Sequence, residues 1–360
     1  MSFVLVTGSA GLVGAETVRQ CSSSGYIVIG VDNNMRATFF GPEASTQWSV
    51  QHLQSTCPGY LHHEIDIRDK DRMEKLFQQF GSDLSGIVHT AAQPSHDWSA
   101  QDPLLDFDVN ARATLLLLEL TRKYAPQAVF VFTSTNKVYG DHPNNLPIVE
   151  QNTRWELDLN HIYGEYGFDE SLSIDHCMHS PFGASKTAAD ILVQEFGRYF
   201  GLKTVVFRGG CLTGPGHAGA ALHGFLAYLM KCAITGTPYT IHGYGGKQVR
   251  DNIHVADLVQ CFLHVLHNPP RNGEVYNIGG SRYSNCSMLE AIALCQEITD
   301  NAMKITLADN PRAGDHIWWI SDVRKFQNHY PEWQYNFNIQ QIMESIYEGL
   351  LERLDNPNIT

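Results

Sequence analysis

The chain has 360 residues and a formal net charge of −13, and hydrophobic residues make up 43% of it. This hydrophobic content supports a folded core and argues against a disordered chain. An acidic chain does not attract nucleic acid or an anionic membrane through its overall charge, so neither is an expected partner.

Short apolar runs alternate with helical patterns through the first half of the chain. The first expected helix follows the first glycines and ends at about Ser24. Two further helices are expected at Lys70–Phe80 and Pro103–Tyr124. The expected strands are Phe3–Thr7, Tyr26–Asp32, Leu61–Asp66, Gly86–Ala91 and Ala128–Ser134. Alternating strands and helices predict an α/β fold with a Rossmann-type, doubly wound parallel sheet.

Two polar segments, Met35–Pro58 and Asp141–Ser180, interrupt this alternation. Loops of this length are usually functional or disordered. Because the second segment directly follows a strand, we expect it to have a function.

The second half predicts a smaller C-terminal α/β domain that binds substrate. The expected elements are helices at Phe182–Phe200, His223–Thr235, Val255–His267, Met288–Thr299 and Ile339–Leu354, and strands at Thr204–Arg208 and Val275–Gly280. We expect the Rossmann domain to contain residues 1–208 and about 240–278, and the smaller domain about 209–239 and 279–360.

The eight cysteines are scattered and form no CxxC pair. Such cysteines indicate reduced thiols, and we expect no metal site. The N-terminus lacks the pattern of a signal peptide, and the longest apolar run, around Leu115–Leu118, is too short to cross a bilayer. We therefore expect a cytoplasmic protein.

A glycine-rich turn separates the first strand from the first helix. Gly8, Gly11 and Gly14 are spaced as GxxGxxG, which lets the backbone approach a pyrophosphate bound at the amide groups of the helix start, here Leu12 and Val13.

Asp32 ends the second strand, 18 residues after Gly14. Its carboxylate can accept hydrogen bonds from ribose hydroxyls and would repel a 2′-phosphate, so NAD is favoured over NADP. The alternative is that Asp32 only forms a turn with Asn33 and Asn34.

Motifs along nearly the whole chain resemble the extended short-chain dehydrogenase/reductase family of NAD-dependent epimerases and dehydratases. In chain order they are TGSAGLVG from Thr7, HTAAQ from His89, DVN ending at Asn110, TSTNKVYG from Thr133, the Ser185-Lys186 pair, GKQVRD from Gly246, NIGG from Asn277 and PRAGD from Pro311. Within the family, the stretches STNKVYGD, YGFDES, HSPFGASK and GKQVRD are most similar to those of the CDP-tyvelose 2-epimerases, also called CDP-paratose 2-epimerases.

The resemblance assigns roles to individual residues. It implies that Thr135 orients the reacting hydroxyl and that Lys186 binds the nicotinamide ribose. The remaining implied cofactor residues are Asn33, Asn34, Asp66, Ile67, Ala91, Ala92, Gln93, Asn110, Thr133 and Arg208. The implied substrate residues are Gln93, Asn136, Gln248, Arg250 and Arg312, of which the two arginines would hold the diphosphate. Each of these residues could instead have a simpler structural role. Thr135 could merely end a strand, Lys186 could be a solvated lysine on a helix, and Arg250 could form a surface ion pair.

The acid/base tyrosine of the family lies four residues before the lysine, and this chain has Phe182 there. Phenylalanine cannot carry a proton. Four explanations remain: an engineered replacement, another acid/base, a reaction that needs none at this position, or a binding protein without activity. The segment before Phe182 contains several titratable residues, and Tyr166 and His179 are the first candidates for a substitute.

The resemblance implies an NAD-dependent nucleotide-sugar epimerase that inverts C2 of a CDP-hexose through a transient ketone. The expected substrate is a CDP- or UDP-linked sugar. The alternatives are a nucleotide-sugar dehydratase or decarboxylase, and a silent protein that binds NAD or a nucleotide-sugar. The resemblance also implies a homodimer.

Overall fold

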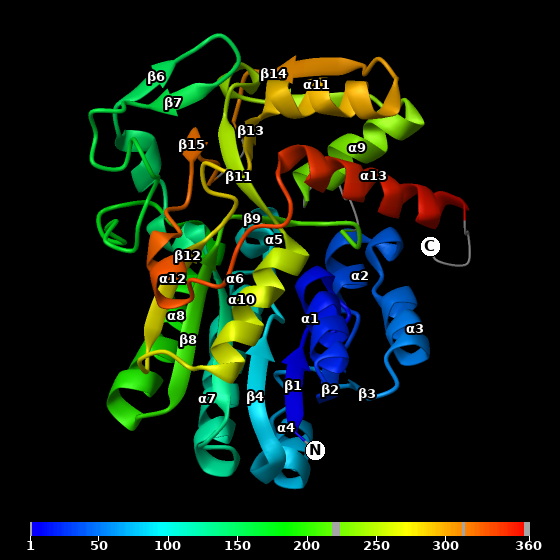
Figure 1. The fold of residues 1–360 in the computed structure, drawn as a ribbon, viewed down its shortest axis with the longest axis vertical. Coiled ribbons are helices and arrows are strands. Elements are labelled where there is room, and N and C mark those ends of the chain that lie inside the picture. Colours follow the sequence, from blue (N-terminus) through cyan, green and yellow to red (C-terminus); the bar gives the residue numbers. More distant parts are fainter. Residues whose placement is uncertain (1, 218–223, 312–313, 356–360) are drawn as a thin grey trace. The chain divides into compact units, whose positions relative to one another are not determined.

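The computed structural model describes residues 2–217, 224–311 and 314–355 (Figure 1). The chain divides into two compact units. The first unit contains Met1–Val138, Pro181–Arg208 and Val259–Tyr276, and the second contains Tyr139–Ser180, Gly209–Leu258 and Asn277–Thr360. The predicted boundaries differ from this division chiefly for residues 139–180 and 240–258, which group with the second unit.

A seven-stranded sheet forms the centre of the first unit, with the strand order β12-β8-β5-β4-β1-β2-β3. Its strands are β1 (Phe3–Thr7), β2 (Ile27–Asp32), β3 (Tyr60–Glu64), β4 (Leu84–His89), β5 (Val129–Thr135), β8 (Lys203–Gly209) and β12 (Glu274–Ile278). β1 pairs in parallel with both β2 and β4. The strand order reverses between β1 and β4, and ligands of such sheets bind at the carboxyl end of this reversal. The predicted fold class is confirmed.

Helices connect these strands. They are α1 (Leu12–Ser23), α2 (Met35–Phe40), α3 (Gln47–Thr56), α4 (Lys70–Phe80), α5 (His96–Gln101), α6 (Pro103–Phe107), α7 (Ala113–Tyr124), α8 (Ser180–Phe200) and α10 (Val255–His267), with short 3₁₀ turns at Pro42–Ala44 and Gly81–Asp83. The apolar faces of α4, α7 and α8 pack into one core with the strands, through side chains such as Leu76, Leu117 and Val193. This burial stabilises the sheet.

The expectation of a long loop at Met35–Pro58 is wrong. The segment forms α2, the turn Pro42–Ala44 and α3. Val50, Leu53 and Cys57 are buried at a helical spacing of three and four residues. The polar residues between them conceal this short apolar stripe in the sequence.

The expected helix over Pro103–Tyr124 consists of three parts. α6 passes into a π-helical turn at Asp108–Arg112, and α7 continues from Ala113. Single π turns inside helices occur frequently at functional sites. This turn carries Asn110.

The second unit combines small sheets with helices. Its strands are β6 (Ile148–Glu150), β7 (Trp155–Leu157), β9 (Cys211–Thr213), β10 (Tyr239–His242), β11 (Val249–His254), β13 (Asn285–Ser287), β14 (Ile305–Ala308) and β15 (Trp318–Trp319). Its helices are α9 (Phe225–Thr235), α11 (Met288–Thr299), α12 (Arg324–His329) and α13 (Ile339–Asp355), with 3₁₀ turns at His142–Asn145 and Tyr244–Gly246. A further 3₁₀ turn at Asn136–Tyr139 spans the boundary between the two units. The expected start of α9 at His223 lies outside the described residues.

The core of the second unit lies among α9, α11 and α13, which are side by side in Figure 1. Ser287 and Glu290 cap the start of α11 through reciprocal hydrogen bonds, which fixes this helix at the end of β13. The predicted functional segment 141–180 contains the β6–β7 hairpin.

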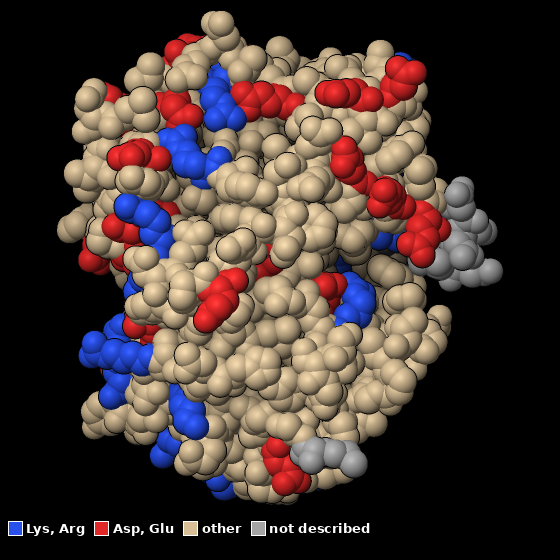
Figure 2. Space-filling model, viewed as in Figure 1, with Lys and Arg blue, Asp and Glu red and all other residues tan. Residues whose placement is uncertain are grey.

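The part of the chain that the structure describes contains no helix long and apolar enough to cross a membrane. On the face shown in Figure 2, Lys and Arg side chains lie among Asp and Glu side chains, and uncharged residues form most of the surface.

Candidate active site

The glycine turn lies at the carboxyl end of β1. Gly8 has a φ of +68°, and a Cβ atom there would lie 2.8 Å from the Cα atom of Ala91. A Cβ atom on Gly14 would lie 2.0 Å from the carbonyl oxygen of Gly8. Only glycine allows this approach at both positions. α1 begins after Gly11, and no side chain caps its first amide groups. These groups fit the pyrophosphate of a dinucleotide.

Asp32 lies beside this turn, at the end of β2. Its carboxylate accepts hydrogen bonds from the backbone N–H groups of Ala10 at 3.1 Å and of Asn34 at 2.8 Å. Asn33 accepts from the N–H group of Met35 at 3.2 Å. The turn and the ribose interpretations of Asp32 are therefore compatible, since carboxylate oxygens have further acceptor positions.

Asp66 and Ile67, the predicted adenine contacts, follow β3. The Arg68 guanidinium donates to Asp66 Oδ2 at 2.7 Å, and Ile67 is buried. Arg68 thus holds the Asp66 carboxylate, and a contact with adenine stays a prediction.

A buried polar network follows β4, next to the partly exposed Ala91 and Ala92. The Asn110 side chain accepts from the N–H group of Gln93 at 2.9 Å and donates to Ser185 Oγ at 3.1 Å. Gln93 Nε2 and Ser185 Oγ donate to the two oxygens of Asp106, at 2.7 and 2.5 Å. The network ties the loop after β4, the π turn and α8 together.

Lys186 lies on α8, one turn after Phe182, and its side chain is buried. Its ammonium group donates to the carbonyl oxygen of Thr133 at 2.8 Å and lies 4.2 Å from the centroid of the Phe132 ring. Burial lowers the pKa of Lys186 to about 8, against the opposing effects of Asp190 and Asp106. This charge therefore lies at the carboxyl end of β5, beside the predicted cofactor site.

Thr133 and Thr135 belong to the same strand end. The Thr133 hydroxyl is buried and has no hydrogen-bond partner among the described residues. Thr135 is partly exposed; its hydroxyl accepts from the N–H group of Lys137 at 3.2 Å and lies 3.5 Å from the amide oxygen of Asn136. An unpartnered polar atom at this position favours a bound polar ligand.

Phe182 occupies the position of the missing tyrosine and is 7% exposed. The ring of His96, the first residue of α5, meets the Phe182 ring edge to face, with 5.0 Å between ring centroids. His96 could not be predicted as a site residue, because a single histidine after a loop carries no recognisable signal in the sequence.

Arg208 lies next to the last residue of β8 and is buried with Asp190. Its guanidinium donates to both carboxylate oxygens of Asp190, at 2.9 and 3.0 Å. Asp190 also accepts from Ser134 Oγ at 2.6 Å. Arg208 therefore links β8, β5 and α8, and a direct contact with the cofactor stays a prediction.

Tyr166 and His179, the predicted substitutes, belong to the second unit. Tyr166 is 41% exposed, and the Arg324 guanidinium lies 3.6 Å from its ring centroid. The hydrogen bond to Glu165 raises the pKa of Tyr166, which makes it a weaker proton donor. His179 lies just before α8, with its Nε2 atom 3.6 Å from the sulfur of Cys177. These contacts do not favour Tyr166 as the substitute.

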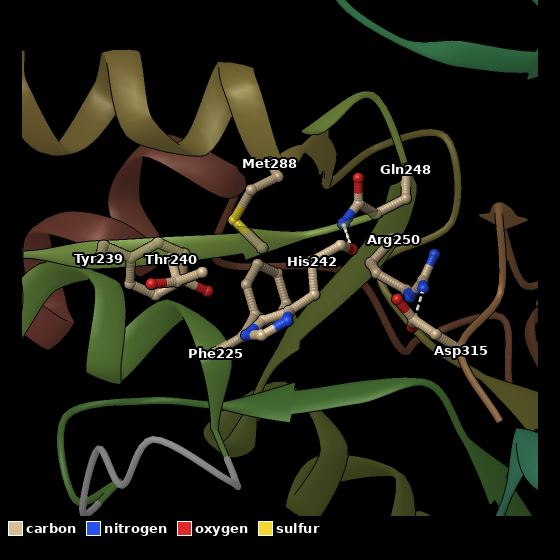
Figure 3. Close-up of a pocket in the computed structure, with 8 residues that line it drawn as sticks. All are labelled: Phe225, Tyr239, Thr240, His242, Gln248, Arg250, Met288 and Asp315. Carbon is tan, nitrogen blue, oxygen red and sulfur yellow. Dashed lines mark hydrogen bonds and ion pairs between the residues drawn. The ribbon is translucent and has the colours of Figure 1, made fainter. Parts of the chain in front are cut away.

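The second unit contains a pocket between β10, β11, α9 and α11 (Figure 3). It encloses about 520 Å³ of space free of protein atoms, including the part open to solvent. Its lining consists of Phe225, Tyr239, Thr240, His242, Gln248, Arg250, Met288 and Asp315. The lining combines apolar or aromatic side chains with polar groups that can orient a ligand, as small-molecule sites do.

Gln248 and Arg250, two predicted substrate residues, lie in this pocket. Arg250 forms an ion pair with Asp315 (Figure 3). The side-chain oxygen of Gln248 is buried without a hydrogen-bond partner among the described residues. It can accept from a hydroxyl or amino group of a ligand. Arg312 lies outside the described residues.

The aromatic residues that line this pocket, Phe225 and Tyr239, were not predicted from the sequence. Phe225 starts α9 and Tyr239 starts β10, and nothing in the sequence indicates that these elements meet. Asp315 ends the PRAGD motif, so its position in the pocket could have been expected from that motif.

Comparison with protein-family models gives a match over residues 5–346 to the family described as GDP-mannose 4,6 dehydratase. Among curated proteins, the CDP-paratose 2-epimerase of Salmonella typhi is 31% identical over 331 residues, 90% of this chain and 92% of that protein. The dTDP-glucose 4,6-dehydratase of Salmonella typhimurium is 29% identical over 330 residues, 86% of this chain and 82% of that protein.

A solved structure has the same fold. The UDP-glucose 4-epimerase of Thermus thermophilus, in complex with NAD, aligns with a TM-score of 0.75 at 26% identity. The alignment covers 97% of this chain and 99% of that chain. The relatives therefore include epimerases and dehydratases that act on sugars linked to different nucleotides.

Proposed function

Because this chain belongs to the GDP-mannose 4,6-dehydratase family, we propose that it is an NAD-dependent epimerase that inverts C2 of a CDP-hexose. Membership confirms the family resemblance and the prediction of an enzyme that acts on nucleotide-sugars. What we propose beyond this is the type of reaction, the carbon that is inverted and the nucleotide of the substrate. The likeness to CDP-paratose 2-epimerase supports these three choices.

The observation that carries the proposal is the buried ammonium of Lys186 at the end of β5, in the same unit as the glycine turn. NAD supplies the hydride acceptor and donor when bound. The turn after β1 would hold its pyrophosphate, Asp32 its adenosine ribose and Lys186 its nicotinamide ribose. Thr135 would orient the sugar hydroxyl, so the chain binds and aligns both reactants.

The pocket of the second unit would bind the nucleotide part of the substrate. Arg250 matches the charge of the diphosphate, and the unpartnered Gln248 oxygen matches a hydroxyl or amino donor. Phe225 and Tyr239 provide apolar surface for a base.

A panel of CDP-, UDP- and dTDP-sugars tests the function. We expect a product of unchanged mass with inverted C2 configuration, fastest with a CDP-hexose, and NAD in the denatured protein. A dehydratase, which the likeness to dTDP-glucose 4,6-dehydratase favours as second candidate, would give a product lighter by one water. Binding without any turnover would contradict both.

We also propose a homodimer that works in the cytoplasm. Exposed apolar side chains lie on α6, α7 and α8 of the first unit, at Leu104, Phe107, Leu115, Ile191, Tyr199 and Phe200. A second copy would cover this surface, here called the α6–α8 surface. All eight cysteines are free thiols, in keeping with a reducing compartment.

A further inference from the structure

The oxidation half of the proposed reaction releases a proton from the sugar hydroxyl, and Phe182 cannot accept it. The required group has to titrate near neutral pH and lie beside the tyrosine position. Histidine is the side chain that meets the first condition without a large shift of its pKa.

His96 meets the second condition. Its ring is 5.0 Å from the Phe182 ring, centroid to centroid, at an interplanar angle of 67°. Phe182 and Lys186 are four residues apart on α8 and share one face of that helix. The imidazole thus lies beside the ring that replaces the phenol, in the unit that also holds Thr135. It is partly buried, so a ligand can reach it.

Hydrogen bonds fix the backbone at His96. Gln93 Oε1 accepts from the N–H group of Ser95 at 2.5 Å, and Gln93 Nε2 donates to the Ser95 carbonyl oxygen at 2.9 Å. The same Gln93 amide donates to Asp106, which accepts from Ser185 on α8. Ser185 Oγ lies on α8, 3.0 Å from the carbonyl oxygen of Phe182. A continuous network therefore positions His96 against the helix that carries Phe182 and Lys186.

We propose that His96 is the acid/base of this enzyme, in place of the missing tyrosine; this inference rests on the proposed function. The hydroxyl proton of the sugar passes to an imidazole nitrogen, and the electron pair of the O–H bond forms the C=O bond. The hydrogen on that carbon would leave as hydride, for which NAD would supply the acceptor and then the donor. When the hydride returns to the opposite face of the ketone, the imidazolium gives the proton back to the oxygen. The cycle therefore consumes no net proton or electron.

The first test combines variants with turnover of the best sugar-nucleotide of the panel. His96→Asn should reduce kcat by about 10²–10⁴-fold with unchanged NAD content. The double change His96→Asn, Phe182→Tyr should restore at least part of the loss, because it supplies a hydroxyl at the tyrosine position. His267→Asn is the matched control, since His267 also contacts an aromatic ring, Tyr26, at 6.0 Å in the first unit. A His96→Asn protein with wild-type kcat would overturn the assignment.

The second test does not depend on turnover. In histidine-labelled protein, the NMR signal of His96, identified by its loss in His96→Asn, should respond to bound NAD. Its apparent pKa should be lower with NAD than with NADH, because the cationic nicotinamide ring disfavours a nearby imidazolium. The His267 signal should not respond. An equal His96 pKa with both forms would contradict its place beside the nicotinamide. Absence of turnover in the wild-type protein would contradict the proposed function but not the position of His96. The NMR comparison would then test whether His96 lies beside the nicotinamide.

Discussion

Lys186 carries its charge in a buried position, so its protonation affects the stability of the fold. Its pKa is lowered from 10.5 to about 8 by burial, so the folded state disfavours the ammonium form. Below about pH 8 this cost is fully present. Between about pH 8 and 10.5 the unfolded chain binds more protons than the folded chain, and the free energy of unfolding from this group rises with pH.

We therefore predict that Lys186→Met loses activity but gains stability. Turnover should fall by about 100-fold or more, because the variant removes the group that we propose to hold the cofactor ribose. At pH 7 the free energy of unfolding should rise by about 1 kcal/mol, and this gain should shrink by pH 10. Thermal unfolding at both pH values checks the prediction, and a gain that is equal at both would contradict it.

Arg250 is expected to act on substrate and not on cofactor. Arg250→Lys keeps the charge but loses the paired donors of the guanidinium. The KM for the sugar-nucleotide should rise about tenfold, equal to about 1.4 kcal/mol, with unchanged NAD content. Lys247→Gln is the control, because Lys247 pairs with Glu150 at 2.8 Å and does not line the pocket. Steady-state kinetics distinguish the two variants, and equal KM values would count against the pocket.

At the scale of elements, the turn between β1 and α1 depends on close backbone contact. In Gly14→Ala, the new methyl group meets the Gly8 carbonyl oxygen. We expect NAD content to fall sharply and the free energy of unfolding to fall by about 1–3 kcal/mol. In Gly59→Ala, the nearest atom is 3.4 Å from the new Cβ atom, so this variant should keep the NAD content and the stability of the wild type. Chromatography of released dinucleotide and thermal unfolding measure the effects. Full NAD content in Gly14→Ala would be the contrary result.

The elements also show what the sequence could predict. The strands at Phe3–Thr7 and near Ile27–Asp32 are apolar and end at turn residues, so pattern and structure agree. α3 has only a narrow apolar stripe and was missed. The hairpin of β6 and β7 has three residues in each strand, which is too short for a recognisable alternation.

In the candidate site, too, some residues could be predicted from the sequence and others could not. Gly8, Asp32, Thr135 and Lys186 follow strands or sit in motifs, so their chain positions alone indicate them. The contact between His96 and Phe182 joins residues 86 positions apart, and the pocket joins α9 and β10 with β11. Such contacts depend on how separate elements pack, which no local pattern encodes.

For the whole molecule, the α6–α8 surface leads to a prediction about assembly. The double change Leu115→Glu, Ile191→Glu places charges on it and should convert a dimer to monomers. Leu307→Glu, at a side chain 69% exposed on β14 of the second unit, should leave the dimer intact. Sedimentation analysis gives the masses. A wild-type monomer, or an unchanged dimer in the double variant, would contradict this interface.

The hydrogen on C2 of the sugar shows whether inversion proceeds through transient oxidation. With a CDP-hexose that carries deuterium at C2, we predict an inverted product that keeps the deuterium, because the same hydride would leave and return through NAD. Mass spectrometry and NMR of the product measure the label. Inversion with loss of deuterium to the solvent would contradict transient oxidation at C2, and absence of inversion would contradict the proposed reaction.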